Sequence, residues 1–77
     1  MMRIVNMHVK DLYKFIMPSC KIHLVVYDES YYPDFIGKFS ELASYRLYNS
    51  IYTARVDRLF FALEDPQILN IYVALNE

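Results

Sequence analysis

The stretch from Val56 to Leu75 constrains the fold more than any other part of the chain. Two runs with strand character, 56–63 and 68–75, flank the turn-forming residues 64–67, so the stretch predicts a hairpin. Successive strand side chains alternate between two faces, which in the second run carry Leu69, Ile71, Val73 and Leu75 on one side and Ile68, Tyr72 and Ala74 on the other. A strand that is apolar on both faces must be covered on both, and a chain of 77 residues has little left to cover it.

Two more strands are predicted upstream. Residues 20–28 are also nearly apolar on both faces, so we expect this strand in the middle of the sheet, beside the last strand. Residues 35–39 predict a short strand antiparallel to it, in which Gly37 indicates a bulge or a close backbone approach.

Two short helices complete the pattern. Val9, Leu12, Tyr13 and Ile16 share one helical face. Asn6 is the expected N-cap of this helix, and Pro18 stops it. A second helix is expected from the cap Ser40 to about residues 49–50, with Leu42, Tyr45 and Tyr48 at helical spacing.

These elements predict one α+β domain over residues 1–77, in the order helix, strand, strand, helix, strand, strand. The sheet is four-stranded and mainly antiparallel, and the two short helices cover one face. The opposite face then keeps an apolar stripe, which a single-domain monomer rarely exposes. We therefore expect a homo-oligomer, with a dimer favoured, or another protein to cover it. Burying about 600 Å² per subunit would contribute about 15 kcal/mol before the costs of association.

Residues that could carry chemistry are few and badly placed. Cys20 and His23 lie three apart on a predicted strand and therefore point to opposite faces, which argues against a metal site and against a Cys–His nucleophile. The acidic pairs 28–29 and 64–65 are typical of turns. One glycine excludes a glycine-rich phosphate loop. We expect no enzyme, no cofactor and no metal.

The remaining composition indicates where the protein works. A single cysteine excludes an internal disulfide and fits a reducing compartment. No run of 18 apolar residues and no signal peptide is visible, so we expect a cytoplasmic protein without a membrane partner. The net charge of −1, with Lys and Arg spread along the chain, makes a nucleic-acid partner less favoured.

Tyrosine is the one residue type in clear excess, with eight in the chain. Tyr and Arg are enriched among the anchors of protein interfaces, and aromatic rings beside cations also stack single-stranded bases. About half of the tyrosines are expected to be ordinary core and rim. The candidate interface residues are Tyr31, Tyr32, Tyr45, Tyr48, Tyr52, Tyr72, Arg46 and Arg55.

Several short segments together resemble a known group of proteins. They are the Val-Lys-Asp-Leu of 9–12, the Pro18 break, the strand 21–28, the Gly-Lys-Phe-Ser-Glu-Leu of 37–42 and the Ile-Tyr-Val of 71–73. The pattern resembles short uncharacterised α+β proteins carried by phages and mobile elements of gut Firmicutes. The usual threonine before Val-Lys-Asp-Leu is His8 here. The resemblance implies an accessory role in a bacterial host cell and no catalytic residue.

The sequence thus favours a non-catalytic, phage-like accessory protein that acts through protein–protein interaction and self-associates through an apolar sheet face. One alternative is an anti-CRISPR-like inhibitor of a host defence nuclease, a host protein then being the partner. Another is a single-stranded nucleic-acid binder that uses surface Tyr and Arg.

Overall fold

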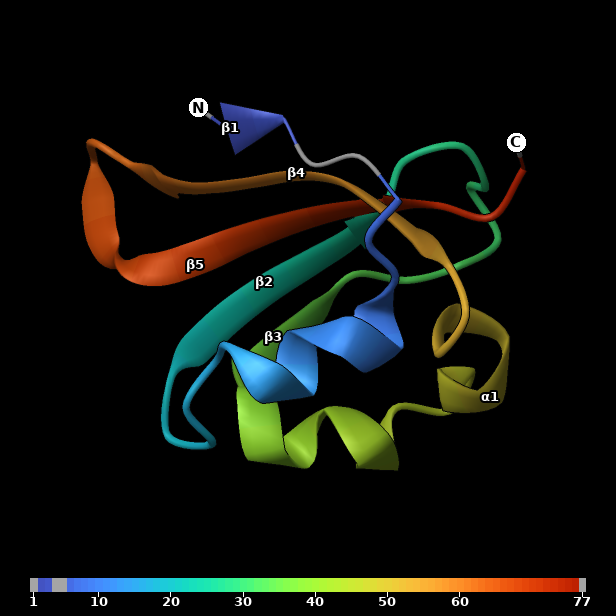
Figure 1. Cartoon of the computed structure of the whole chain (residues 1–77), viewed down its shortest axis with the longest axis horizontal. Coiled ribbons are helices and arrows are strands. Elements are labelled where there is room, and N and C mark those ends of the chain that lie inside the picture. The colour runs from blue at the N-terminus through green and yellow to red at the C-terminus, as the bar shows by residue number, and fades with distance from the viewer. Residues whose placement is uncertain (1, 4–5, 77) are drawn as a thin grey trace.

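The computed structural model describes residues 2–3 and 6–76, which form a mixed sheet with short helices on one face (Figure 1). The strands are β1 Met2–Arg3, β2 Lys21–Val26, β3 Phe35–Lys38, β4 Arg55–Ala62 and β5 Asp65–Ala74. Their order across the sheet is β1-β4-β5-β2-β3, and only the β2–β5 pairing among these strands is parallel. The α+β class, the four predicted strands and the central position of the first beside the last are confirmed. The two-residue β1 adds an edge strand that the pattern did not predict.

The hairpin between β4 and β5 turns earlier than predicted. The turn is Leu63-Glu64, since Ala62 already pairs with Asp65 across the strands. The register then shifts, and Phe61 pairs with Leu69. Pro66 lies in this irregular part of the hairpin. Proline has no backbone N–H, but no regular ladder hydrogen bond is lost at this position. The pairing of β5 with β2 begins only at Ile68.

A second irregularity in β4 decides which of its side chains enter the core. The register shifts between Val56 and Arg58, so one residue of β4, Asp57, has no partner of its own in β5. Such a bulge reverses the alternation of faces. Val56 pairs with Val73 and Leu59 pairs with Ile71, so residues three apart in β4 lie on the same side of the sheet.

The first helix is a 3₁₀ helix, η1, over Val9–Lys14. Its N-cap is His8, whose backbone N–H donates to Asp11 Oδ2 at 3.0 Å. The predicted cap Asn6 is wrong: it has φ 62 and lies in the left-handed region, which Asn tolerates. Because 3₁₀ side chains repeat every three residues, Val9 and Leu12 are buried, whereas Tyr13 is 44 % exposed.

The second predicted helix is two helices. The 3₁₀ helix η2 spans Phe39–Ser44, with Lys38 and not Ser40 at its N-cap. The Lys38 backbone N–H donates to Glu41 Oε1 at 3.0 Å, which explains the earlier start. Tyr45 is extended, at ψ 131, and breaks the helix before α1, Tyr48–Ile51, begins.

Helices and strands meet in one core on one side of the sheet, below it in Figure 1. The helices contribute Val9, Leu12, Phe39, Leu42 and Ile51, and the strands contribute Ile22, Leu24, Val26, Val56, Leu69, Ile71 and Val73. The expectation that helices cover one face of the sheet is confirmed. Among the described residues no charged or polar side chain is buried in this core.

Candidate binding surfaces

The side of the sheet opposite the helices is called the open face here, and no helix in the described part of the chain lies on it (Figure 1). The strand register places on it Lys21, His23, Val25, Ile36, Lys38, Arg55, Arg58, Phe60, Ile68, Asn70, Tyr72 and Ala74. Ile36 is 69 % exposed, whereas Val25 and Tyr72 are half-buried by their neighbours on the sheet. The open face is therefore a mixture of apolar and cationic side chains and not a continuous apolar stripe.

Three aromatic rings cross the open face diagonally. The Phe60 ring on β4 lies 5.6 Å from the Tyr72 ring on β5, measured between centroids. The Tyr72 ring lies 6.5 Å from that of Tyr27, which directly follows β2. Such spacings are typical of aromatic pairs, which stabilise a fold beyond the area they bury. Tyr27 is 48 % exposed, so the row ends at the surface.

The charges of the open face are mainly positive. Lys21 pairs with Lys38 where β2 meets β3, and Arg58 lies opposite Tyr72. The nearest carboxylate to Arg58 is that of Asp57, with 3.8 Å between Arg58 Nε and Asp57 Oδ2.

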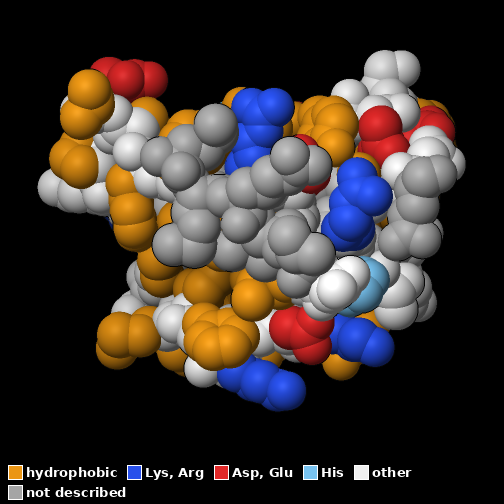
Figure 2. All heavy atoms as spheres, turned by 45° about the horizontal axis from the view of Figure 1, so that its top comes forward, with side chains coloured by type: hydrophobic (Ala, Val, Ile, Leu, Met, Phe, Trp, Pro, Cys, Tyr) orange, Lys and Arg blue, Asp and Glu red, His pale blue; other side chains and the backbone are white. Residues whose placement is uncertain are grey.

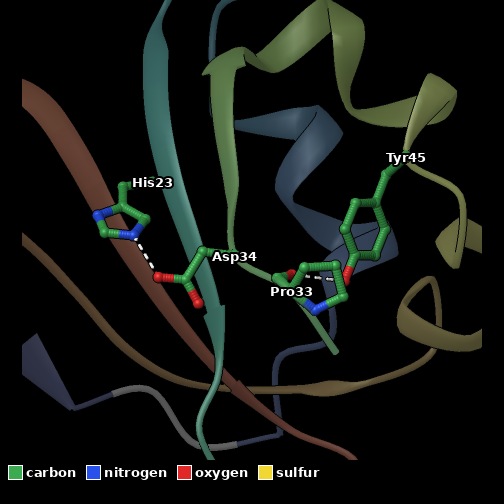
Figure 3. Close-up of polar contacts among 4 residues, drawn as sticks. All are labelled: His23, Pro33, Asp34 and Tyr45. Carbon is green, nitrogen blue, oxygen red and sulfur yellow. Dashed lines mark hydrogen bonds and ion pairs between the residues drawn. The ribbon is translucent and has the colours of Figure 1, made fainter. Parts of the chain in front are cut away.

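A second carboxylate lies at the edge of the open face and holds a loop. His23 Nε2 and Asp34 Oδ2 are 2.8 Å apart, and Tyr45 donates its hydroxyl to the Pro33 carbonyl at 2.7 Å (Figure 3). The segment 33–34 is thus held from both sides, by a strand residue and by a residue between two helices. No third catalytic partner of the His23–Asp34 pair is found among the described residues, so the geometry indicates a structural link.

The other end of this loop is tied to the C-terminal segment. The Asp28 carboxylate accepts the Leu75 backbone N–H at 3.1 Å and the Asn76 backbone N–H at 2.8 Å. Burial opposes ionisation of Asp28, but these hydrogen bonds outweigh it and lower its pKa. The acidic pair 28–29 is therefore more than a solvated turn, because Glu29 also accepts from the Asn76 amide at 3.0 Å.

An apolar groove of about 430 Å³ lies on the helix side, where the helices stop short of the hairpin end of β4 and β5. This hairpin groove is lined by Phe15, Ile16, Met17, Ser19, Cys20, Leu59, Phe61 and Leu69. Figure 2 shows hydrophobic side chains gathered on the side of the molecule where the hairpin and the segment after η1 lie. Phe15 is 68 % exposed, Met17 71 % and Phe61 55 %. Leu63, at the hairpin turn, is 97 % exposed.

A tyrosine cluster joins η1 to α1. The Tyr13 and Tyr48 hydroxyls are 2.6 Å apart, and the Tyr48 and Tyr52 rings are 5.6 Å apart. Tyr13 also packs on Phe39, at 4.6 Å between ring centroids. Burial, the hydrogen bond with Tyr48 and repulsion from neighbouring tyrosinates raise the pKa of Tyr13 well above its ordinary value. The cluster fits a packing role between helices.

The predicted interface residues fall into separate groups. Tyr72 and Arg55 lie on the open face, and Tyr48 and Tyr52 belong to the tyrosine cluster. Tyr31 and Tyr32 form an edge-to-face pair in the loop after β2, and Tyr45 packs edge-on against Phe35. Arg46 is exposed. These residues therefore do not form one surface, because the sheet lies between the open face and the helices that carry Tyr48 and Tyr52.

Sequence reasoning missed the residues that leave the hairpin groove open. Phe15 and Met17 lie outside the predicted helical face of 9, 12, 13 and 16, and this displacement was the available signal. For Phe61 there was no such signal, because its exposure depends on where the helices end. Cys20 lies in this groove and His23 on the open face, so the expectation that they point to opposite faces is confirmed.

Comparison of the chain with protein-family models, with curated proteins and with solved structures finds no match. Within the described residues, no group of three or more His, Cys, Asp or Glu is placed to hold a metal ion. None of the helices in the described ranges is long and apolar enough to span a membrane.

Proposed function

We propose that the protein is a non-catalytic interaction module that self-associates as a dimer through the hairpin groove, which lies on the helix side of the sheet, and not through the opposite sheet face that the sequence suggested. The observation that carries this proposal is a groove without charge beside a projecting apolar side chain. None of the described residues that line the groove is charged, and Leu63 protrudes next to it. A monomer gains nothing from exposing Phe15, Met17 and Phe61 together, whereas a dimer buries them.

The groove and the projecting Leu63 belong to the same end of the molecule, which favours a second copy as the occupant. In a two-fold symmetric contact the same patch of both subunits meets, so each subunit offers both the projecting side chain and the groove that receives it. Leu63 of one subunit enters the groove of the other, and the reverse contact forms at the same time. The open face is less suited to this contact, because two copies would bring Lys21, Lys38 and Arg58 near the same cations of the partner.

Mass in solution tests the proposal with a matched pair of variants. We expect the parent chain to sediment as a dimer at micromolar concentration, Phe61→Lys as a monomer, and Ile36→Lys as a dimer. Both replaced side chains are exposed apolar residues on β-strands, but Ile36 lies on the open face. A parent chain that stays monomeric at 100 times that concentration overturns the proposal. Loss of the dimer in Ile36→Lys alone would assign the contact to the open face.

Disulfide trapping tests the geometry itself. Cys20 is the single cysteine of the chain and lines the groove. A variant with Cys20→Ser and Leu63→Cys is mixed with the parent chain under mild oxidation, so that a mixed disulfide can form only between two chains. We expect this heterodimer to exceed the one formed by a control with Cys20→Ser and Ala43→Cys, because Ala43 is exposed but does not line the groove. Equal yields from the two variants contradict the arrangement.

A further inference from the structure

We propose that the open face binds single-stranded nucleic acid, a function separate from self-association through the hairpin groove. Three aromatic rings lie in a row on adjacent strands, from Phe60 through Tyr72 to Tyr27. Base stacking on aromatic side chains needs no particular sequence, because every base has a π-face. Tyr27, which directly follows β2, is exposed, and Phe60 on β4 and Tyr72 on β5 are half-buried, so the row offers ring surface on which two or three successive bases can be stacked.

The charge distribution supports a polyanion as the partner. The whole chain has a net charge of −1, yet four Lys and Arg of residues 6–76 lie in the open-face register, at Lys21, Lys38, Arg55 and Arg58. Three carboxylates approach this face among the described residues: Asp57 lies 3.8 Å from Arg58, Asp34 contacts His23, and Glu41 accepts the Lys38 backbone N–H and lines a pocket with Lys21 and Lys38. The open face is therefore cationic although the protein as a whole is not, which is the local electrostatic footprint of nucleic-acid binding.

The positions of rings and cations match a strand that crosses the sheet. Lys21 and Lys38 lie where β2 and β3 meet, level with Ile68 at the beginning of the β2–β5 ladder. Arg55 lies at the other end, opposite Ala74, and the rings lie between these cations. A backbone running from one cationic end to the other places its bases on the rings. A double helix cannot stack its paired bases in this way, so the single-stranded form is preferred.

An apolar protein partner fits this face less well. It would have to desolvate four cationic side chains without returning a charge to them, and an uncompensated buried charge is costly. An acidic protein segment would meet the charge requirement but would leave the three rings without a stacking partner. Nucleic acid satisfies both features at once.

Fluorescence anisotropy with a labelled 15-nucleotide oligo-dT and a labelled oligo-U tests the proposal. If all four cations contact phosphates, raising NaCl from 50 to 200 mM should weaken binding about 50-fold, from a slope of about −0.7 per contact in log–log form. Tyr72→Ala should weaken binding at least tenfold, whereas Tyr72→Phe, which keeps the ring, should bind within about twofold of the parent chain. Circular dichroism confirms that each variant is folded.

Four controls make the test decisive. Lys38→Gln should lower both the affinity and the salt slope without touching a ring, and Phe15→Ala in the hairpin groove should change neither. Equal affinity for a duplex of the same length would mean attraction by charge alone and overturns the stacking proposal. Binding of a poly-glutamate peptide as tight as that of oligo-dT, or no binding of either oligonucleotide at 50 mM NaCl, overturns it as well. None of these outcomes depends on the dimer contact, which the Phe61→Lys variant tests separately.

Discussion

Replacing either of two neighbouring residues in β5 by aspartate should produce opposite outcomes. Val73 is fully buried and lies between Val56 on β4 and Val26 on β2, under the helices. Tyr72, one residue earlier, is half-buried on the open face. We expect Val73→Asp to lose most or all of the folding stability and Tyr72→Asp to stay folded with a lower melting temperature. The two variants share the introduced charge and the strand, so they differ mainly in the face on which the charge lies.

The magnitudes follow from the surroundings of each side chain. Losing the buried Val73 side chain costs about 1.5–3 kcal/mol, and an unpaired carboxylate in the core adds about 3–5 kcal/mol. The whole chain is expected to have about 4–12 kcal/mol of stability, at about 0.05–0.15 kcal/mol per residue. Tyr72→Asp loses ring contacts with Phe60 and Tyr27, at about 0.5–1.5 kcal/mol each. Its carboxylate stays solvated and lies opposite Arg58.

Circular dichroism during heating is the assay. For a domain of this size about 1 kcal/mol corresponds to about 4–8 °C in melting temperature, so Tyr72→Asp should melt about 5–20 °C below the parent chain. Val73→Asp should melt well below Tyr72→Asp or show no cooperative transition, while Val73→Ala, which creates a cavity without a charge, should still melt cooperatively. If Val73→Asp melts within 3 °C of the parent, or if Tyr72→Asp unfolds while Val73→Asp does not, the assignment of the two faces is wrong.

The remaining predictions concern the hydrogen bonds that hold the loop between β2 and β3. Because the folded-state pKa of Asp28 is lowered, its contribution to stability is present above the unfolded value of about 3.9 and is lost as the pH falls through the lower folded value. Asp28→Asn should therefore cost about 1 kcal/mol at pH 7 and progressively less as the pH falls below the unfolded value, and urea unfolding over this pH range measures the difference; a cost that does not change with pH would contradict the carboxylate's role. Tyr45→Phe removes the hydrogen bond to the Pro33 carbonyl and should cost about 1 kcal/mol, whereas Tyr31→Phe, for which no side-chain hydrogen bond is found among the described residues, should cost under about 0.5 kcal/mol. Urea unfolding of the two variants compares them directly, and a larger loss in Tyr31→Phe would refute the tie.

Local patterns in the chain predicted the strands well and the helices less well. Alternation along β2 and β5 depends only on the two-residue period of a strand, so it placed Ile22 with Leu24 on one face and Ile71 with Val73 on one face, but it left open which face the helices cover. The helices are only four to six residues long, and two of them are 3₁₀ helices. A pattern based on 3.6 residues per turn therefore misplaced Tyr13 and merged η2 with α1.

The candidate surfaces were less predictable than the fold. The sequence indicated that Tyr72 and Arg55 belong to an interface, but it grouped them with Tyr48 and Tyr52, which pack between the helices. The cationic character of the open face could not be inferred from a net charge of −1, because it depends on strand pairing that brings Lys21 next to Lys38 and Arg58 next to Tyr72.

The sequence by itself determined that this chain forms a small α+β sheet with two nearly apolar central strands and too little helix to cover both faces. That much follows from side-chain periodicity and chain length, which are properties of the chain alone. Only the tertiary structure decided which apolar side chains stay exposed. The bulge at Asp57 sets which side chains of β4 face the helices, and the end of η1 leaves Phe61 exposed. Both depend on contacts between different segments, since the bulge arises where β4 meets β5, about 15 residues later in the chain, and the exposure of Phe61 depends on where η1, about 45 residues earlier, ends. Local periodicity carries no information about such contacts.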